Sequence, residues 1–415
     1  MAAKKILVAH PGKQHVFQLL AALKKTGSLF KFITTVYDKD DSLTNKAKKF
    51  LKGKNLKKAA SRKSTILNDN EIILYNEGGG LLLILLGKIG INKTLNNYFY
   101  RIIHRSFANK VAKYAIKNNV DAVVLFDSNV YDCFKKIKQE KPQIVCILDV
   151  TIASRLYMKE IYINDMAVTN DKELYKEQIH LWNEANIENY KNEFINSDYL
   201  LVGSEFVKKS IIPIIGSADK IVKIPYGVDV SQFNVTKKDY STGPLKLFFV
   251  GGVNRRKGIH HLLGVVSQYT KEQVVLSLAG GYDANSDLYL NYKDSENITF
   301  EGFVTRDVVA DKYASSHIFV LPSLSEGLAL VGLEALASGL PVLCTENTGV
   351  NDLITNGENG FVVPASDPAA FKAKIDWFIA NRDKIESMSL AARNSVEGYS
   401  WDKYHERIVD FFNNI

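Results

Sequence analysis

The feature that most constrains the fold is an arrangement that occurs twice: an apolar run, a glycine-bearing loop and a helical segment. In the first copy, Leu245–Val250 precedes the loop GGVNRRKG, and a helix is expected from about Gly258. In the second, Ile318–Leu321 precedes a loop that carries Glu326, and a helix is expected to begin near Ala329. Short apolar runs of this kind are typical of buried parallel strands. The helix N-termini that follow such strands collect free backbone N–H groups, which suit an anion such as a diphosphate.

The same alternation of strands and helices extends over the whole chain. Further runs expected to form strands are Lys5–Ala9, Phe32–Tyr37, Asp121–Asp127, Gln143–Asp149, Val274–Gly281 and Asn297–Val304. This pattern predicts an α/β fold with doubly wound parallel sheets, and it restarts near residue 221. Because 415 residues are too many for one ordinary core, two domains are expected, at 1–220 and 221–398, followed by a closing helix at 399–415.

Composition is typical of a soluble globular protein. The apolar content of 46% and the charged content of 24% are ordinary. The longest apolar run of the N-terminal half, Leu81–Leu86, is too short to cross a bilayer, and the N-terminal residues lack the layout of a signal peptide. Three widely spaced cysteines predict reduced thiols and a cytoplasmic location. The sequence has no cluster of histidines and cysteines that predicts a structural zinc site.

Positive charge is concentrated in one stretch of the N-terminal half. The chain has a net charge of +8, and Lys46–Lys63 contains nine Lys or Arg residues and no acidic residue. A solvated basic surface explains such a run without a ligand, whereas an anionic membrane surface or an acidic acceptor would complement its charge. The helical segment 94–119 interleaves apolar residues with Arg101 and Arg105, which fits either a core helix or one that docks on anionic lipid. Nucleic acid is not expected as a partner, because no nucleic-acid-binding motif accompanies these charges.

Candidate ligand-binding residues follow several of the predicted strands. Gly12 and His15 follow the first strand, and Asp149 ends another. In open parallel sheets the carboxyl ends of the strands border the ligand crevice, so these residues are candidates for substrate contacts. A polar surface position for His15 and a helix cap for Asp149 are the alternative interpretations. Arg256 and Lys257 stand just before a predicted helix, where cations and backbone N–H groups can meet a diphosphate together.

The segment from 321 to 343 resembles the signature of retaining glycosyltransferases of the GT-B fold, family four (glycosyl transferases group 1). The matching elements are Pro322-Ser323, Glu326-Gly327, Glu334-Ala335 and Gly339-Leu340-Pro341-Val342, with seven residues between the two glutamates. Further matching elements are Gly227-Val228-Asp229 with Phe233, Gly302-Phe303-Val304, and Gly349, Asp352, Gly357 and Gly360. The resemblance covers roughly residues 198–400, and before them it extends only to the fold.

This resemblance implies two Rossmann-like domains facing a central cleft. The first domain would hold the acceptor, the second would hold a nucleotide-diphosphate sugar, and the closing helix would cross back onto the first domain. Arg256 and Lys257 would contact the departing diphosphate, Glu334 the ribose hydroxyls, and Glu326 the hydroxyls of the donor sugar. The remaining donor-site positions implied by the resemblance are Gly252, Val304, Gly327, Leu328, Ala329 and Leu330.

The chain departs from the family pattern at three positions. Gly252 stands where an arginine is usual, so Arg255 or Arg256 is expected to replace that arginine, and the sequence does not decide between them. Asp149 stands near the end of a strand where related enzymes commonly have a histidine. Ala329 stands where the family usually has a glycine, and its extra methyl group leaves the identity of the donor sugar open.

The implied activity is sugar transfer from a nucleotide-diphosphate sugar, with a UDP-sugar expected, to a glycan or lipid-linked glycan in bacterial surface polysaccharide or glycoconjugate synthesis. The family retains the anomeric configuration, which favours same-face attack over double displacement with Glu326 or Asp149 as nucleophile. Neither a cofactor nor a metal is expected, because the Arg/Lys cluster can neutralise the leaving group. The expected location is cytoplasmic, with peripheral attachment at the inner face of the membrane. A nucleotide-sugar epimerase, a phosphorylase and a non-catalytic nucleotide-binding scaffold at the membrane are the competing functions.

Overall fold

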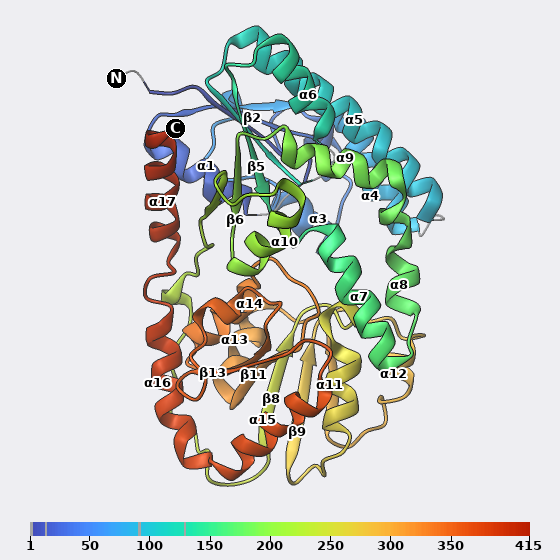
Figure 1. Cartoon of the computed structure of the whole chain (residues 1–415), viewed down its shortest axis with the longest axis vertical. Helices are drawn as coiled ribbons and strands as arrows, with labels where there is room; N and C mark the ends of the chain where they lie inside the picture. The colour runs from blue at the N-terminus through green and yellow to red at the C-terminus, as the bar shows by residue number, and fades with distance from the viewer. Residues whose placement is uncertain (1–2, 13–14, 90–92, 128–129) are drawn as a thin grey trace.

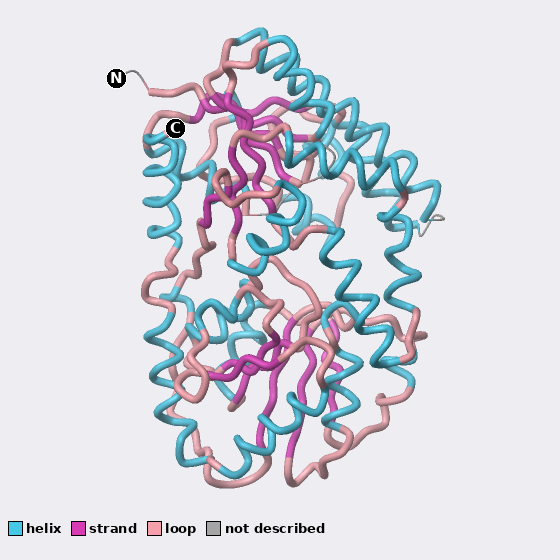
Figure 2. Tube along the Cα trace, in the orientation of Figure 1, coloured by secondary structure: helices cyan, strands magenta, loops and turns pink. Residues whose placement is uncertain are grey.

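The computed structural model describes residues 3–12, 15–89, 93–127 and 130–415. The chain forms two lobes stacked along its long axis, each built on one parallel sheet with flanking helices (Figure 1, Figure 2). The strand order is β3-β2-β1-β4-β5-β6-β7 in the first sheet and β10-β9-β8-β11-β12-β13 in the second. The predicted α/β class with two doubly wound parallel sheets is therefore confirmed.

The first sheet is formed by the N-terminal half of the chain. Its strands are β1 (Ile6–Ala9), β2 (Leu29–Thr34), β3 (Ile72–Leu74), β4 (Ala122–Phe126), β5 (Val145–Val150), β6 (Tyr199–Val202) and β7 (Ile221–Lys223). The central strands β1 and β4 are buried along their whole length, which explains why they appear in the sequence as unbroken apolar runs. β7 pairs with β6 in this sheet although it lies just beyond the predicted limit at residue 220.

Helices cover both faces of the first sheet. The helices that pack on one face are α5 (Lys93–Asn118), α6 (Tyr131–Glu140), α9 (Glu184–Ile195) and α10 (Glu205–Ile215). The helices on the opposite face are α1 (Val16–Lys25) and α17 (Trp401–Asn414). The remaining helical segments of this half are α2 (Leu43–Lys48), α3 (Gly53–Ala60), η1 (Asp69–Glu71), α4 (Glu77–Ile89), α7 (Arg155–Thr169), α8 (Glu173–Gln178) and η2 (Ile179–Trp182).

The second sheet has the same construction with six strands. They are β8 (Leu245–Val250), β9 (Val274–Ala279), β10 (Ile298–Gly302), β11 (Ile318–Leu321), β12 (Val342–Thr345) and β13 (Gly360–Val363). The helices of this half are η3 (Val230–Gln232), η4 (Arg255–Lys257), α11 (Ile259–Val266), α12 (Asp287–Leu290), α13 (Arg306–Ser315), α14 (Leu330–Ala337), η5 (Val350–Leu353), α15 (Pro368–Ala380), η6 (Arg382–Lys384) and α16 (Ile385–Ser395).

The strand order reverses once in each sheet, and this reversal determines where a ligand can bind. β1 lies between β2 and β4, and β8 lies between β9 and β11. The connections that leave the two central strands diverge to opposite faces, so a crevice remains at their carboxyl ends. The loops after β1 and β4 in one lobe, and after β8 and β11 in the other, are therefore the positions from which side chains reach a substrate.

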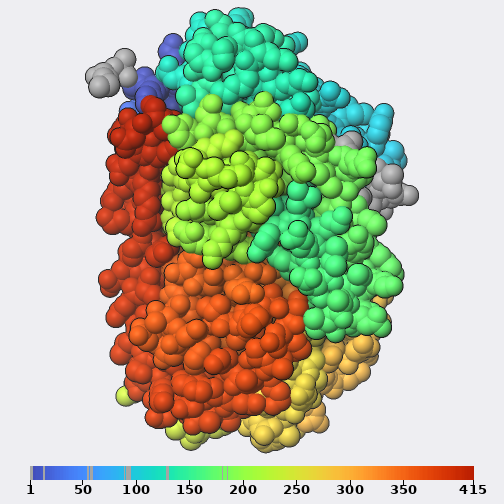
Figure 3. Space-filling model, viewed as in Figure 1, coloured from blue at the N-terminus to red at the C-terminus, as the bar shows by residue number. Residues whose placement is uncertain are grey.

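Two parts of the chain connect the lobes along their sides. α17 returns from the second lobe and packs on α1, and the Lys4 Nζ donates a hydrogen bond of 2.8 Å to the Phe412 carbonyl near its end. On the other side, α7 and α8 extend from the first lobe along the second (Figure 1). In the space-filling view the two lobes and these connecting helices are in close contact (Figure 3). Within the described ranges, no helix is both long and apolar enough to span a bilayer.

Candidate functional site

The loops that follow β8 and β11 are held together by a close backbone contact. Gly258, the residue before α11, has a φ of +67°, and a Cβ there would lie 1.8 Å from the Pro322 carbonyl oxygen. Only glycine allows both this conformation and this approach. The Leu324 N–H also donates to the Arg256 carbonyl at 2.9 Å. The residues before α11 are thereby fixed against the loop that carries Glu326.

Glu326 lies between two cations at this junction. Its carboxylate is buried, with 7% of the residue exposed, and its Oε1 lies 2.5 Å from the Lys257 Nζ. The Arg256 Nη1 lies 3.4 Å from the other carboxylate oxygen and donates to the Ser325 carbonyl at 2.8 Å. Two cations against one carboxylate leave an excess of positive charge. The structure thus brings the predicted residues Arg256, Lys257 and Glu326 into one cluster.

The neighbouring Arg255 has different partners. Its Nε lies 2.5 Å from the Asp171 carboxylate, and its Nη2 lies 2.5 Å from the Asp287 carboxylate. Two carboxylates therefore already neutralise this guanidinium. Of the two arginines that the sequence left open, Arg256 is the one that lies beside Glu326.

Glu334 is the fifth residue of α14 and lies half-buried at the same edge of the second sheet. The Tyr313 hydroxyl donates a hydrogen bond of 3.3 Å to its Oε2. Burial raises the pKa of this carboxyl, and the positive charge of Arg306 opposes that rise. Leu330 begins the same helix and is also half-buried. The predicted start of the helix near Ala329 agrees with the observed start to within one residue.

The Glu-Gly loop also contacts the first lobe. A Cβ on Gly327 would lie 1.9 Å from the Thr151 carbonyl oxygen, and the Ser204 hydroxyl donates to the Gly327 carbonyl at 2.6 Å. Leu328 and Ala329 are buried beside it, with 6% and 7% exposed. The residues that follow Glu326 are therefore fixed by contacts with both lobes.

Gly252 and Val304 lie farther along the carboxyl edge of the second sheet. Gly252 follows β8 and is half-buried. Val304 follows β10 and packs, half-buried, against the main hydrophobic core. The structure places both residues just after strands of the second sheet.

His15 and Asp149 form a buried pair at the carboxyl edge of the first sheet. The His15 Nε2 lies 2.8 Å from the Asp149 Oδ2, and the two side chains are only 5% and 4% exposed. The His15 ring also packs on the Tyr226 ring, with 4.2 Å between centroids. The alternative that Asp149 caps the following helix is wrong, because the Ser154 hydroxyl accepts the hydrogen bond at the start of α7. The alternative that His15 is a polar surface residue is wrong because its ring is buried.

A hollow of about 350 Å³ lies in the same lobe, between the loops that follow β1 and β2 and the helices α4 and α5. Gly12 lines it together with His10, Tyr100 and His104. The Gly12 N–H donates to the His10 Nδ1 at 2.8 Å, so the loop after β1 is folded back on its own strand.

Two residues near the first-lobe site were not among the predicted site residues. Asp127 follows β4 and accepts a hydrogen bond of 2.8 Å from the Thr151 hydroxyl, and burial raises its pKa to about 7. Its place at the end of a strand was the one available signal. Tyr226, which packs on His15, lies in a segment whose sequence gives no sign of this contact.

One group of three metal-ligating side chains occurs in the part of the chain that the structure describes: Asp165 of α7 with His260 and His261 of α11, whose ligand atoms lie within 4.8 Å of one another. The Nε2 atoms of His260 and His261 lie 3.1 Å and 2.6 Å from the Asp165 carboxylate. The Ser366 hydroxyl donates to the same carboxylate at 2.6 Å. These hydrogen bonds satisfy Asp165 with protein donors and link the first lobe to the second.

Comparison with known families finds a match in the second lobe. Residues 231–395 match the family model described as Glycosyl transferases group 1. Sulfoquinovosyl transferase SQD2 of Arabidopsis thaliana is 29% identical over 219 residues, which are 49% of this chain and 42% of that protein. The capsular polysaccharide biosynthesis glycosyltransferase CapM of Staphylococcus aureus is 26% identical over 233 residues, which are 52% of this chain and 60% of that protein. The chain thus matches these curated relatives over about half of their length.

Solved structures resemble the chain over its whole length. Sucrose-phosphate synthase from Thermosynechococcus elongatus superposes with a TM-score of 0.66 at 18% identity and covers 99% of this chain and 98% of its own. HepE of Anabaena, solved in complex with UDP, superposes with a TM-score of 0.65 at 14% identity and covers 99% of this chain and 100% of its own. At such identities the likeness shows the fold alone, and that fold is GT-B.

Proposed function

Since the second lobe matches glycosyl transferases group 1 and the whole chain has the GT-B fold, we propose that this protein is a glycosyltransferase that uses a nucleotide-diphosphate sugar. The observation that carries this proposal is the cluster of Arg256, Lys257 and Glu326 at the junction of the two glycine-bearing loops. The nucleotide is expected to be UDP, in line with HepE, which was solved with UDP and with UDP-glucose. The acceptor is a glycan or lipid-linked glycan, in bacterial surface polysaccharide or glycoconjugate synthesis.

The proposed chemistry begins with cleavage of the anomeric C–O bond, during which negative charge grows on the departing diphosphate. Arg256 and Lys257 are positioned before the reaction to stabilise that charge, together with backbone N–H groups at the start of α11. Glu334 accepts hydrogen bonds from the two ribose hydroxyls, because each of its carboxylate oxygens can serve one hydroxyl. Glu326 holds hydroxyls of the donor sugar and thereby orients the anomeric carbon.

We propose retention of the anomeric configuration through same-face attack. In this scheme the acceptor hydroxyl approaches from the side of the leaving diphosphate, and a phosphate oxygen takes its proton. Neither Glu326 nor Asp149 then needs to be free as a nucleophile, which agrees with the Lys257 and His15 contacts that hold these two carboxylates. His15, positioned by Asp149 and Tyr226, is proposed to contact the donor sugar from the first lobe.

The donor site is proposed to work without a cofactor and without a metal ion. Arg256 and Lys257 supply the positive charge that a divalent cation would otherwise bring to the diphosphate. Donor binding is therefore expected to be insensitive to EDTA.

We further propose that the protein attaches peripherally to an anionic membrane surface at the cytoplasmic face. α4 exposes Leu85 and Ile89, with 52% and 64% of each residue accessible, and α5 packs beside α4. α2, which also contacts α4, belongs to the basic stretch noted in the sequence. Of the residues in that stretch, Lys46, Lys49 and Lys52 are exposed, and Phe50 between them is 86% exposed. Exposed apolar side chains beside exposed lysines complement an anionic bilayer. The sequence also places Ile91 close to these apolar residues of α4, and Ile91 lies outside the described residues.

The proposed function is tested by thermal shift against UDP, GDP, ADP, CMP and the corresponding nucleotide sugars, each with and without EDTA. Ligand that binds only the folded protein raises Tm by mass action. We expect one nucleoside diphosphate to raise Tm equally in both conditions, and Lys257→Ala to reduce that rise. The absence of any shift would contradict a donor site and favour the scaffold function.

Product analysis separates the competing enzymatic functions. Proton NMR of the reaction mixture shows the anomeric configuration of the transferred sugar. Formation of an isomerised sugar nucleotide without transfer would indicate an epimerase, and dependence of turnover on inorganic phosphate would indicate a phosphorylase.

A further inference from the structure

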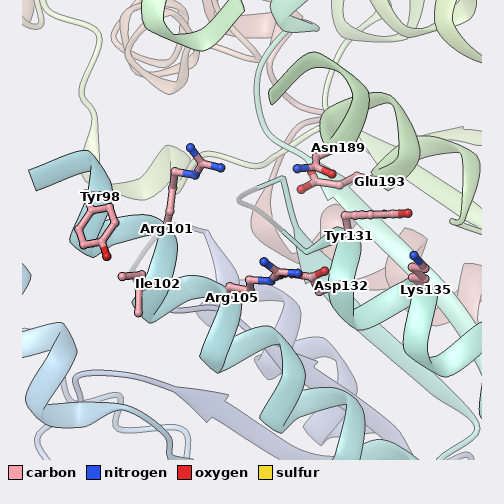
Figure 4. Close-up of a pocket in the computed structure, with 9 residues that line it drawn as sticks. All are labelled: Tyr98, Arg101, Ile102, Arg105, Tyr131, Asp132, Lys135, Asn189 and Glu193. Carbon is pink, nitrogen blue, oxygen red and sulfur yellow. Dashed lines mark ion pairs between the residues drawn. The ribbon is translucent and has the colours of Figure 1, made fainter. Parts of the chain in front are cut away.

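A separate cavity of about 410 Å³ lies in the first lobe between α5, α6 and α9 (Figure 4). Arg101 and Arg105 reach into this region from α5, Lys135 lies on α6, and Asn189 and Glu193 lie on α9 (Figure 4). None of these five residues belongs to the donor site described above. We call this cavity the α5–α6–α9 pocket.

The charges of the α5–α6–α9 pocket do not cancel. Arg105 pairs with Asp132, with 2.8 Å between Nε and Oδ2. Arg101 and Lys135 form no ion pair with any other residue that the structure describes, and both side chains are exposed. The pocket is lined by three cations and by the carboxyl groups of Asp132 and Glu193, so it keeps an excess of positive charge that would attract an anionic ligand.

Glu193 is the deepest polar group of the pocket. The residue is 3% exposed, and its Oε1 accepts a hydrogen bond of 2.8 Å from the Val130 N–H at the start of α6. Its Oε2 is buried and has no hydrogen-bond partner among the residues that the structure describes. Burial raises the pKa of Glu193 to about 7. A buried polar oxygen without a partner costs free energy, and a ligand hydroxyl could satisfy it.

The pocket also contains the side-chain types that bind sugars. The Tyr98 and Tyr131 rings line it, and Asn189 adds an amide that can both donate and accept. Aromatic rings offer apolar surface to the faces of a sugar, while amide and carboxylate groups serve its hydroxyls. Cations, rings and hydroxyl partners together fit a sugar that carries a negative charge.

The position of the pocket relates it to the reaction. Tyr131 begins α6, the helix that follows β4, so the pocket opens at the carboxyl edge of the first sheet. The His15–Asp149 pair lies at the same edge. Asp127 is close enough for its charge to interact with both Glu193 and Asp149. A ligand in the pocket is therefore on the first-lobe side of the cleft, opposite the donor-binding lobe.

We propose that the α5–α6–α9 pocket binds an anionic sugar of the acceptor, one that carries a phosphate or a carboxylate group. Arg101 and Lys135 bind the anionic group, and Asn189 and Glu193 bind sugar hydroxyls. This inference rests on the proposed glycosyltransferase function, because it assigns the pocket to the acceptor of that reaction.

The test is isothermal titration of the full chain at low ionic strength with glucose 1-phosphate, glucuronic acid and glucose. The first two sugars distinguish a phosphate from a carboxylate as the recognised group, and glucose is the neutral control. The test variant is Arg101→Ala/Lys135→Ala, which changes exposed side chains only. The matched control is Lys113→Ala, an exposed lysine farther along α5 that does not line the pocket. The Lys257→Ala variant reports binding at the donor site instead.

We expect at least one anionic sugar to bind the wild-type chain more tightly than glucose, and added salt to weaken that binding. Arg101→Ala/Lys135→Ala should weaken it by at least about tenfold, the usual effect of losing charge-assisted hydrogen bonds, while Lys113→Ala should not. The proposal is overturned if the double variant binds the anionic sugars as tightly as the wild type does, or if the wild type binds glucose equally tightly. It is also overturned if only Lys257→Ala loses anionic-sugar binding. The nucleotide-induced thermal shift is measured on the same variants. Its absence in the wild type would contradict the donor function, whereas a normal shift without anionic-sugar binding would contradict the pocket alone.

Discussion

Glu326 is a buried carboxylate, and the proposed function places it beside a charged substrate. Lys257 and Arg256 balance its charge from the loop after β8. Removal of one partner of a buried ion pair leaves an uncompensated charge, which usually costs more than the pair itself contributes. At the scale of single residues, the cluster therefore acts as a unit, and its members cannot be changed independently.

Lys257→Ala is expected to lower kcat/KM for sugar transfer by roughly 100- to 1,000-fold, the usual effect of losing one preorganised donor to a developing anion. Steady-state kinetics with the nucleotide sugar identified by thermal shift measures this change. Because the cluster acts as a unit, adding Glu326→Gln should cost less than the product of the two single effects. Lys271→Ala removes an exposed lysine that pairs with Glu296, and it serves as the control. Wild-type transfer by Lys257→Ala would show that the cluster does not contact the donor.

Glu193 is expected to make the stability of the protein fall as the pH rises. Its pKa in the folded chain is raised to about 7, above the ordinary value of 4.5, so the folded state binds the proton more tightly than the unfolded state. The contribution of this proton to the free energy of unfolding is fully present below the ordinary pKa of a glutamate. It is lost as the pH rises through 7, and the loss is at most about 3 kcal/mol. Urea unfolding at acidic and at alkaline pH measures it. Glu193→Gln keeps an acceptor for Val130 and should reduce the pH dependence, so an unchanged dependence would contradict this assignment.

At the scale of elements, Gly327 is the position where the loop after β11 touches the loop after β5. Gly327→Ala would place a methyl group 1.9 Å from the Thr151 carbonyl oxygen, so the two loops must separate. We expect kcat to fall by about 100-fold, because a displacement of about 1 Å is enough to misalign reacting groups. Gly78→Ala in α4 meets no neighbouring atom within 4 Å and is the matched control. A normal kcat in Gly327→Ala would mean that this contact does not position Glu326.

α7 is linked to the second lobe through the hydrogen bonds that Asp165 accepts. Asp165→Asn keeps the shape of the side chain but replaces one carboxylate oxygen, an acceptor, with an NH2 group, a donor. An NH2 group in place of Oδ2 loses the bond to His260, and one in place of Oδ1 loses the bonds to His261 and Ser366. Hydrogen bonds to a charged group contribute about 1.5–3 kcal/mol each, so the free energy of unfolding should fall by about 2–4 kcal/mol. Denaturant unfolding measures it, with Glu160→Gln, an exposed residue of the same helix, as control. Equal stability of the two variants would show that the link is not important for folding.

The elements differ in how far the sequence predicts them. β8 and β11 have the predicted limits, because each mainly apolar run is ended by a turn residue, Gly251 after β8 and Pro322 after β11. β2 was predicted at Phe32–Tyr37 but spans Leu29–Thr34, since parallel pairing with β1 brings Leu29 opposite Ile6. The limits of β2 differ from the predicted ones because they depend on its register with β1. The composition of one strand does not show how it aligns with its neighbour.

The candidate site shows the same limit. Glu326, Glu334 and Lys257 can be located in the sequence because they lie within short motifs of fixed spacing. The partners of these motifs come from distant segments, as when Asp165 of α7 meets His260 of α11. Glu193 gives no sequence signal at all, because its importance comes from burial beneath the start of α6.

At the scale of the whole molecule, the lobes are joined by helices on both sides of the cleft. α17 packs on α1, and α7 reaches His260 and His261. The apolar and basic side chains proposed to meet a membrane lie elsewhere in the first lobe, on α4 and in the segment from Lys46 to Lys52. If the first lobe binds a lipid-linked acceptor, as proposed, this arrangement would place it at the lipid surface and leave the second lobe open to soluble nucleotide sugar.

Attachment to the membrane is tested by flotation with vesicles that contain anionic lipid. We expect the wild-type chain to float at low salt and to dissociate as salt increases, because salt screens the attraction between anionic lipid and the exposed Lys46, Lys49 and Lys52. Leu85→Glu/Ile89→Glu places two negative charges on the exposed apolar face of α4 and should abolish flotation. Leu390→Glu changes a similarly exposed leucine on α16 of the second lobe and should leave it intact. Flotation of the α4 variant, or equal binding to neutral vesicles, would show that α4 and its lysine neighbours are not the attachment surface.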